Sequence, residues 1–170
     1  MPDTAPATTL DPRYGDEGAE PTPWAEARSR MAEAELLWFV STRPGGGPHA
    51  TPLLSVWHDG APHICTGPGE QKAANLAADP RCALLAATDR QEGLDVVLEG
   101  VAERVTDPGT LATLAELWAE KYGETWRFAV ADGAFSHDGG VAHVFRIRPV
   151  RGYGFGKGEV FSQTRWRFSG

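Results

Sequence analysis

The sequence has few cysteines: Cys65 and Cys82 are the only two in 170 residues, and they form no CxxC pair. This spacing favours reduced thiols in a core over a disulfide framework or a zinc site. The five histidines also lack the spacing of metal ligands, so we expect no metal. No uncharged apolar run reaches the length of a membrane span, and the N-terminus lacks the pattern of a secretory signal. These absences predict a cytoplasmic protein without a membrane partner.

Positive charge is scarce as well. The chain has 16 Lys and Arg against 23 Asp and Glu, a formal net charge of −7, which argues against a nucleic-acid partner. Residues 1–22 are acidic and rich in proline, with few large apolar groups, so we expect a tail that is disordered or ordered only by contact. The whole chain has 41% hydrophobic and 23% charged residues, near globular averages, and the remaining residues 23–170 suit one globular domain.

Strand patterns dominate that domain. Asp59-Gly60 predicts a tight type I′ turn between two strands, and Gly100 is expected to mark a bulge. Thr22 and Pro23 predict the cap and first turn of a helix, and Asp107-Pro108 predicts the start of another. Residues 124–140 carry no clear pattern. The predicted strands are 37–43, 50–58, 62–66, 82–87, 95–105 and one or two within 141–156, and the predicted helices are 24–35, 70–79 and 107–123. An antiparallel β-barrel with helices at its openings accommodates this order.

The segment CTGPGEQKAANL, residues 65–76, joins the end of a predicted strand to a short helix. Free backbone N–H groups and the positive end of the helix dipole would face this turn, where Thr66 adds a hydroxyl and Lys72 a full charge. The arrangement suits a phosphate group. An ordinary glycine turn beside a solvated lysine has the same pattern, so the motif alone does not decide between them.

Two segments near the C-terminus have unusual compositions. In RGYGFGKGE, glycine occupies every second position from 152 to 158, so one face of a strand would be bare and would admit a flat ring or another backbone. A flexible glycine loop is the alternative. In QTRWRF, residues 163–168, two arginines flank a tryptophan. They suit an anionic aromatic ligand or a subunit interface, and both alternatives stay open.

Taken together, four segments resemble the flavin and deazaflavin oxidoreductases built on the split β-barrel of pyridoxamine 5′-phosphate oxidase. They are PHATPLLSVW, TGPGEQKAANLAADPR, VVLEGVAERVTDP and GFGKGEVFSQTRWRF, within residues 36–168. The resemblance implies a mainly β fold, a split β-barrel of about six or seven mostly antiparallel strands with flanking helices. It also implies a homodimer with cofactor sites at the subunit interface. The branch that the chain resembles most is bacterial, especially actinobacterial, and uses coenzyme F-420.

The resemblance further implies where a cofactor would lie. The strand HATPLL would run along the tricyclic ring, and the segment after residue 65 would hold the phosphate. The implied contacts are His49, Thr51, Pro52 and Leu53 for the ring, Thr66, Gly67 and Lys72 for the phosphate, and Phe155 and Arg165 for the cofactor of the other subunit. On the substrate side we ourselves expect His49, Trp57, Trp126 and Arg165.

Charge separates the candidate cofactors. Flavin-binding relatives have a basic pair where this chain has Gln71-Lys72, and an arginine where it has His49. FMN ends in a phosphate monoester with nearly two negative charges, whereas F-420 contains a diester with one, so fewer cations suffice for F-420. We therefore expect an oxidoreductase that transfers hydride between F-420 and a small conjugated organic molecule. An FMN-dependent oxidase or reductase and a non-catalytic flavin- or deazaflavin-binding protein are the alternatives. The cations available for the polyglutamate tail of F-420 are Arg43, Arg90, Lys121 and Arg127.

Overall fold

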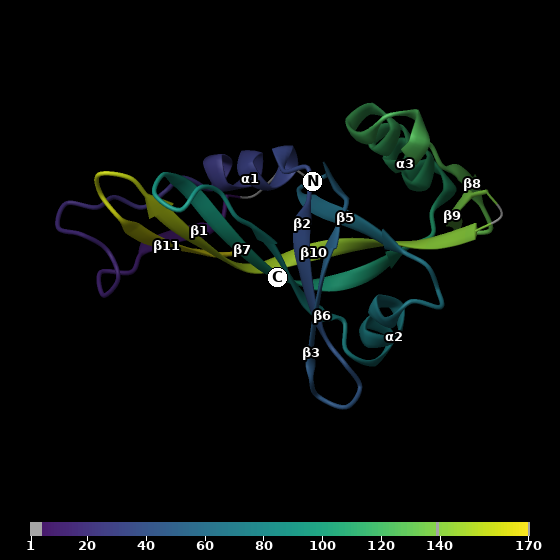
Figure 1. The fold of residues 1–170 in the computed structure, drawn as a ribbon, viewed down its shortest axis with the longest axis horizontal. Coiled ribbons are helices and arrows are strands. Elements are labelled where there is room, and N and C mark those ends of the chain that lie inside the picture. Colours follow the sequence, from purple (N-terminus) through teal and green to yellow (C-terminus); the bar gives the residue numbers. More distant parts are fainter. Residues whose placement is uncertain (1–4, 139, 170) are drawn as a thin grey trace.

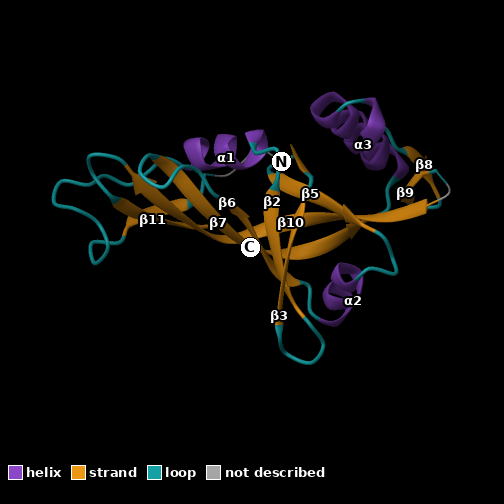
Figure 2. Cartoon of the chain, viewed as in Figure 1, coloured by secondary structure: helices purple, strands orange, loops and turns teal. Residues whose placement is uncertain are grey.

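A computed structural model describes residues 5–138 and 140–169. Strands dominate this part of the chain, with three α-helices and one short 3-10 helix among them (Figure 2). In chain order the elements are β1 (Ala7–Leu10), α1 (Trp24–Glu33), β2 (Leu37–Thr42), β3 (Pro48–Leu53), β4 (Ser55–His58), β5 (Ala61–Thr66), α2 (Gln71–Ala78), β6 (Arg81–Ala86), β7 (Gly93–Val105), α3 (Pro108–Tyr122), the 3-10 helix η1 (Glu124–Trp126), β8 (Ala129–Ala131), β9 (Ala134–His137), β10 (Gly140–Lys157) and β11 (Ser162–Arg167).

The described residues contain eleven strands, more than the six or seven that the sequence predicts. Strand β1 lies in the segment expected to be a tail, and β8 and β9 lie in the segment 124–140, which had no clear pattern. The predicted strand 50–58 is two strands, β3 and β4, that separate at Leu54. The short or irregular strands are therefore the ones that the periodicity misses.

Strand β10 is the centre of the sheet. Its C-terminal part pairs with β11 on one side and β7 on the other, and its N-terminal part pairs with β5 and β9. The sheet continues from β7 through β6 and β2 to β3, and all the described pairs are antiparallel. The structure thus confirms a mainly β, antiparallel split barrel with flanking helices.

The helices lie on two sides of the sheet. Helices α1 and α3 cover one side, and α2 lies on the other beside the projecting β2–β3 hairpin (Figure 1). A hydrogen bond of 2.9 Å from Asn75 Nδ2 to Ser41 Oγ ties α2 to β2. Among the described helices, none is long and apolar enough to cross a membrane.

Several local predictions are confirmed. Asp59 and Gly60 have positive φ angles of 43° and 73°, as a type I′ turn between β4 and β5 requires. Asp107 caps α3 by accepting a 2.8 Å hydrogen bond from the N–H of Thr110. The cap predicted at Thr22 is wrong, because Pro23 holds that position and the Thr22 N–H donates instead to Thr164 Oγ1.

The glycine-rich part of β10 is a strand, and its bare face is covered by an indole of the same chain. A Cβ at Gly152 would lie 3.0 Å from Trp166 Cε3, and one at Gly154 would lie 2.3 Å from Trp166 Cη2. Trp166 is fully buried on β11, 5.5 Å from the ring of Trp24. The flat ring that the pattern admits is therefore part of the core.

Gly100 on β7 likewise allows a close approach, here of the backbone of β10, beside the one irregular point of the β7–β10 pairing. A Cβ there would lie 2.6 Å from the carbonyl oxygen of Arg148, and the register shifts between Pro149 and Arg151. Gly100 thus lies opposite an irregularity of β10, where the sequence predicts a bulge.

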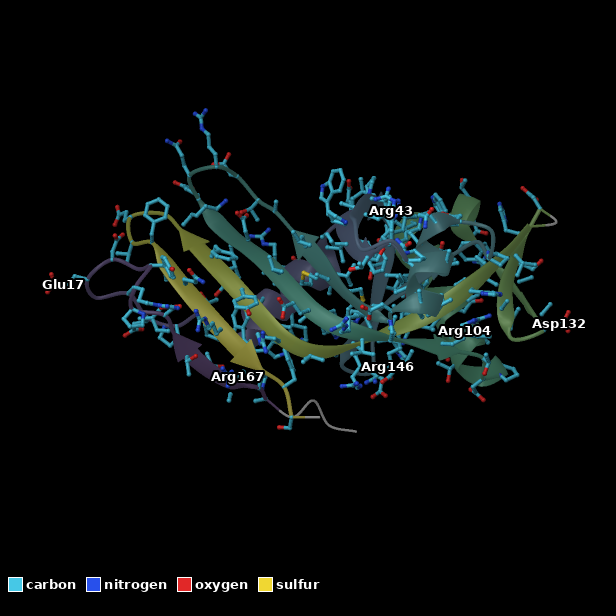
Figure 3. The ribbon with its side chains drawn as sticks, turned by 90° about the horizontal axis from the view of Figure 1, so that it is seen from below. Glu17, Arg43, Arg104, Asp132, Arg146 and Arg167 are labelled. Atoms are coloured by element: carbon cyan, nitrogen blue, oxygen red, sulfur yellow. The ribbon has the colours of Figure 1, made fainter. Side chains whose placement is uncertain are left out.

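The N-terminal segment is ordered by contact in the residues that the structure describes. Strand β1 pairs with β11 from Ala7 opposite Arg167 to Leu10 opposite Thr164. Asp11 is 4% exposed and forms ion pairs with Arg13 and Arg165. The loop around Glu17 projects beyond the end of the sheet (Figure 3). Residues 7–10 thus lie in the sheet of the barrel.

Candidate functional site

Strand β3 presents alternating side chains along an open edge of the sheet. His49, Thr51 and Leu53 lie opposite Ser41, Phe39 and Leu37 of β2, all buried, so these residues of β3 share the inner face. Pro52 belongs to the other face and is exposed. In the described part of the chain β3 pairs only with β2, and its second edge therefore offers backbone N–H and C=O groups to a ligand.

Two polar atoms on this inner face are buried without a partner. His49 Nδ1 and Thr51 Oγ1 are enclosed, and neither makes a hydrogen bond in the described structure. Buried polar atoms usually have a partner, and leaving one unpaired costs about 1–3 kcal/mol. The two atoms lie two positions apart on the strand that the resemblance assigns to a cofactor ring. They are therefore suited to binding the polar edge of a ligand.

A second group of side chains lies where β5 turns into α2. We call Thr66, Gly67, Glu70 and Lys72 the β5–α2 corner. Thr66 is 2% exposed, and its hydroxyl oxygen is buried without a hydrogen bond. Lys72 is largely buried, and its ammonium group bonds Glu70 Oε2 at 2.5 Å. The Gly67 N–H donates to Glu70 Oε1 at 2.7 Å.

A carboxylate thus occupies the corner that the sequence assigns to a phosphate. Partial burial raises the pKa of Glu70, but the Lys72 ammonium and the Gly67 N–H outweigh burial and hold this pKa below its ordinary value. The nearby Thr66 hydroxyl adds to the lowering. Glu70 is therefore ionised at neutral pH, and the donors of the corner converge on an anion.

Helix α2 connects this corner to β3. Gln71 Nε2 donates to Asn75 Oδ1 at 2.8 Å, and Asn75 donates to Ser41, the residue opposite His49. Asn75 is fully buried, so the relay fixes α2 against the sheet. The β3 face and the β5–α2 corner consequently belong to one side of the molecule (Figure 1).

Two further groups, one histidine and one arginine, lie on the same sheet face as Thr66, and the sequence analysis did not place them in the site. His143 of β10 is the cross-strand partner of Thr66, and Arg104 is the partner of Phe145, two residues along β10. Partial burial, and then the charge of Arg104, lower the pKa of His143. The alternation in VAHVFRIR places His143 on a strand, but only the register with β5 places it beside Thr66.

The corner also borders a hollow of about 190 Å³. Phe128 and Phe135 stack in its wall with their ring centroids 4.7 Å apart, and the ring of His137 lies edge-on to Phe128 at 5.9 Å. Gly67 and Glu70 also line this hollow. An apolar wall therefore lies next to the charged corner.

The two tryptophan candidates lie on other elements. Trp57 of β4 is half-buried, packs against the core cluster and lies 6.1 Å from the ring of Trp24. Trp126 lies after α3 and is 43% exposed, with its ring 6.4 Å from Phe128. Neither lies on β3 or α2.

Phe155 and Arg165 lie on β10 and β11, at the end of the sheet away from α2 (Figure 1). Phe155 is 38% exposed, whereas Arg165 forms an ion pair with Asp11. The direct cross-strand partner of Arg165 is Tyr153, and Phe155 is its diagonal neighbour. Within one chain these two residues do not meet the β5–α2 corner.

Most cations considered for an anionic tail have partners elsewhere. Arg43 donates to the carbonyl of Pro48 at the tip of the β2–β3 hairpin, apart from Arg104 (Figure 3). Lys121 donates to the carbonyls of Ala32 and Ser55, and Arg127 forms ion pairs with glutamates of α3 and η1. These three side chains have structural partners.

The fold and the side chains above define a split β-barrel whose third strand has one open edge in the described part of the chain. Residues 23–155 match the family described as pyridoxamine 5′-phosphate oxidase. This match covers more than half of the chain, so the chain belongs to that family, and the resemblance drawn from the sequence is confirmed. No curated protein matches the sequence.

Solved structures show the same fold. A heme binding protein from Mycobacterium smegmatis is 24% identical with a TM-score of 0.62, and the alignment covers 85% of this chain but only 58% of that one. HutZ, the heme storage protein from Vibrio cholerae, is 16% identical with a TM-score of 0.57, over 82% and 93% of the two chains. An F420 reductase is 20% identical with a TM-score of 0.56, over 74% and 94%. At these identities the comparisons establish the fold alone.

Proposed function

We propose that this protein is an oxidoreductase that binds coenzyme F-420 and transfers hydride between it and a small conjugated organic molecule. The observation that carries the proposal is a set of three buried polar atoms without hydrogen bonds, on β3 and at the turn into α2, which is hydrogen-bonded to the neighbouring strand β2. They are His49 Nδ1 and Thr51 Oγ1 on β3, and Thr66 Oγ1 at the end of β5. Membership of the family and the fold of an F420 reductase support the same assignment.

Apart from Glu70, the groups at the β5–α2 corner fit one negative charge. Lys72 supplies the single ammonium group, Thr66 a buried hydroxyl and Gly67 a backbone N–H. Gln71, next to Lys72, is neutral. A phosphodiester with one charge matches this donor set better than a monoester with nearly two.

The residues of β3 would orient the ring. When bound, F-420 supplies the hydride chemistry, and the protein positions it and limits access of water. His49 Nδ1 can hold or accept one proton at the ring edge, and Thr51 Oγ1 can donate or accept a hydrogen bond. Leu53, 8% exposed, closes the inner end of the strand with an apolar surface.

A second copy of the chain is part of the proposal. Phe155 on β10 and Arg165 on β11 lie toward the end of the sheet away from α2, as expected if they reach the cofactor of the other subunit. Sedimentation of the purified protein tests the dimer. A location in the cytoplasm is likewise proposed, and fractionation of the native host would check it.

Ligand titration tests the cofactor assignment. The purified protein is titrated with F-420 and with FMN, and binding is followed by fluorescence quenching. We expect tighter binding of F-420, and tighter binding of FMN would assign the protein to the FMN-dependent alternative. A mass spectrum of the cofactor bound in the native host checks the result independently.

A non-catalytic cofactor-binding protein is the second candidate, and one observation favours it. Two proteins of the same fold are described as a heme binding protein and a heme storage protein. Oxidation of reduced F-420 in the presence of enones, quinones or tetrapyrroles separates the candidates. An oxidoreductase gives turnover with at least one of these acceptors, whereas a binding protein gives tight association without turnover.

A further inference from the structure

We propose that Glu70 is a charge filter that sets the cofactor preference, because it disfavours a phosphate monoester at the β5–α2 corner more than a phosphodiester. This inference deepens the proposed function, since it depends on a phosphate-bearing cofactor binding at that corner. It names a specificity-determining residue of this chain that the sequence analysis did not single out.

The carboxylate of Glu70 already uses the donors that a phosphate would need. Its Oε1 accepts the Gly67 N–H at 2.7 Å, and its Oε2 accepts the Lys72 ammonium at 2.5 Å. A Cβ at position 67 would lie 3.1 Å from Oε1, so glycine is what lets the carboxylate approach this closely. The buried hydroxyl of Thr66 is a further donor of the corner, and it lies near enough to Glu70 to help lower the pKa of that carboxyl.

Helix capping does not explain this conformation. Glu70 holds the cap position of α2, but its side chain makes no hydrogen bond to the N–H groups of that helix. It folds back toward Gly67 and Lys72 instead. The first N–H groups of α2 therefore stay available, and the carboxylate acts on the corner rather than on the helix end.

The charges of Glu70 and Lys72 cancel. An incoming phosphate must take the ammonium group from Glu70, and the released carboxylate remains close by. Its backbone is fixed, because the Asn75–Ser41 hydrogen bond holds α2 on β2. Arg104, a further cation of this sheet face, donates to the carbonyls of Val105 and Val144 and is already engaged.

The repulsion from the released carboxylate scales with the charge of the ligand. A monoester that carries nearly two charges meets about twice the unfavourable free energy that a diester with one charge meets. Either ligand must break the same contact between Lys72 and Glu70 before it binds. The repulsion from Glu70 differs, and the filter thus raises the dissociation constant of FMN more than that of F-420.

Matched ligands and variants isolate this effect. Dissociation constants are measured for riboflavin, FMN, F-420 and the deazaflavin chromophore without its phosphodiester tail. The proteins are the wild type, Glu70→Gln, Glu70→Ala and the control Glu124→Gln, which removes a carboxylate from η1. Urea unfolding of each variant verifies that it folds.

We expect Glu70→Gln to tighten binding of FMN about tenfold and binding of F-420 only about threefold. The carboxylate repels the singly charged diester about half as strongly, in free energy, as the nearly doubly charged monoester. Riboflavin and the tailless chromophore should bind unchanged, and Glu124→Gln should change none of the four. An FMN to F-420 ratio that stays the same in both Glu70 variants overturns the inference. So does a failure of both variants to bind FMN.

The outcomes for the filter and for the proposed function differ. If wild-type protein binds F-420 tightly and the ratio stays fixed, the filter is wrong and the function stands. If wild-type protein prefers FMN, while Glu70→Gln gains affinity about tenfold for FMN and only about threefold for F-420, the filter stands and the F-420 assignment fails.

Discussion

The indole of Trp166 lies directly against the backbone of Gly154, where a Cβ would come within 2.3 Å of Trp166 Cη2. Trp166 has little freedom to move away. Its ring is fully buried and packs edge-on against Trp24 at 5.5 Å, and its Nε1–H donates to the carbonyl of Thr22 at 3.1 Å. This contact joins β10, β11 and the segment before α1 in one core.

Replacing Gly154 by alanine should therefore destabilise the protein. We expect Gly154→Ala to lower the free energy of unfolding by about 1–3 kcal/mol, the usual cost of overpacking a core. Urea unfolding followed by tryptophan fluorescence measures the change. Gly45→Ala is the matched control, since nothing lies within 4 Å of a Cβ at Gly45. Equal stability of the two variants would contradict the packing described here.

The sequence predicts the architecture well because its signals are local. The Asp59-Gly60 turn and the Asp107 cap depend on a few neighbouring residues, and both are present. The alternation of glycine in β10 also predicts a bare strand face correctly. It does not identify the ring on that face, because Trp166 meets Gly154 only through the register of β10 with β11.

The candidate site is less predictable, because its geometry depends on contacts between distant strands. The spacing of Thr66 and Lys72 marks the turn between β5 and α2, but nothing in it indicates that Glu70 folds back onto Gly67. His143 joins Thr66 through the pairing of β10 with β5. Trp57, expected on the substrate side, is half-buried and packs against the core cluster, and its part in ligand binding stays a prediction.

The two cysteines should react slowly in the folded protein. Burial raises the pKa of both thiols, Cys65 and Cys82, to about 12, so almost no thiolate exists near pH 8. We expect Ellman's reagent to label neither thiol rapidly in the native state and both in guanidinium chloride. Rapid labelling of one thiol without denaturant would contradict the burial of that residue.

His63 should make the stability depend on pH. It is 1% exposed on β5, and burial lowers its pKa to about 4, with smaller contributions from His58 and Arg146. Between about pH 6.5 and 4 the unfolded chain binds a proton that the folded chain does not. Stability is therefore complete above this range and falls by about 2–3 kcal/mol as the pH drops through it.

Urea unfolding between pH 7 and 5 measures this dependence. The variant His63→Gln removes the buried titrating group, so its stability should fall less steeply with pH than that of the wild type. A shallow slope remains, because partial burial also lowers the pKa of His143. His137→Gln is the control, since the side chain of His137 is 44% exposed. Identical slopes for His63→Gln and the wild type would remove His63 as the cause.

Lys72 should matter only to ligands that carry a phosphate. Its ammonium group is the one charged donor of the β5–α2 corner, so we expect Lys72→Ala to weaken binding of F-420 by about 1.5–3 kcal/mol. Riboflavin lacks the phosphate, and its dissociation constant should stay the same. Loss of the half-exposed ion pair with Glu70 should cost at most about 1 kcal/mol of stability, so the variant folds.

Fluorescence titration of both ligands against Lys72→Ala and Arg127→Ala makes this comparison. Arg127 forms ion pairs with Glu116 and Glu124, away from β3 and α2, and its loss should affect neither ligand. Equal weakening of F-420 and riboflavin by Lys72→Ala would point to a disturbed fold rather than a lost phosphate contact. An unchanged dissociation constant for F-420 would place its phosphate elsewhere, because an ammonium group bonded to the ligand cannot be removed without loss of affinity.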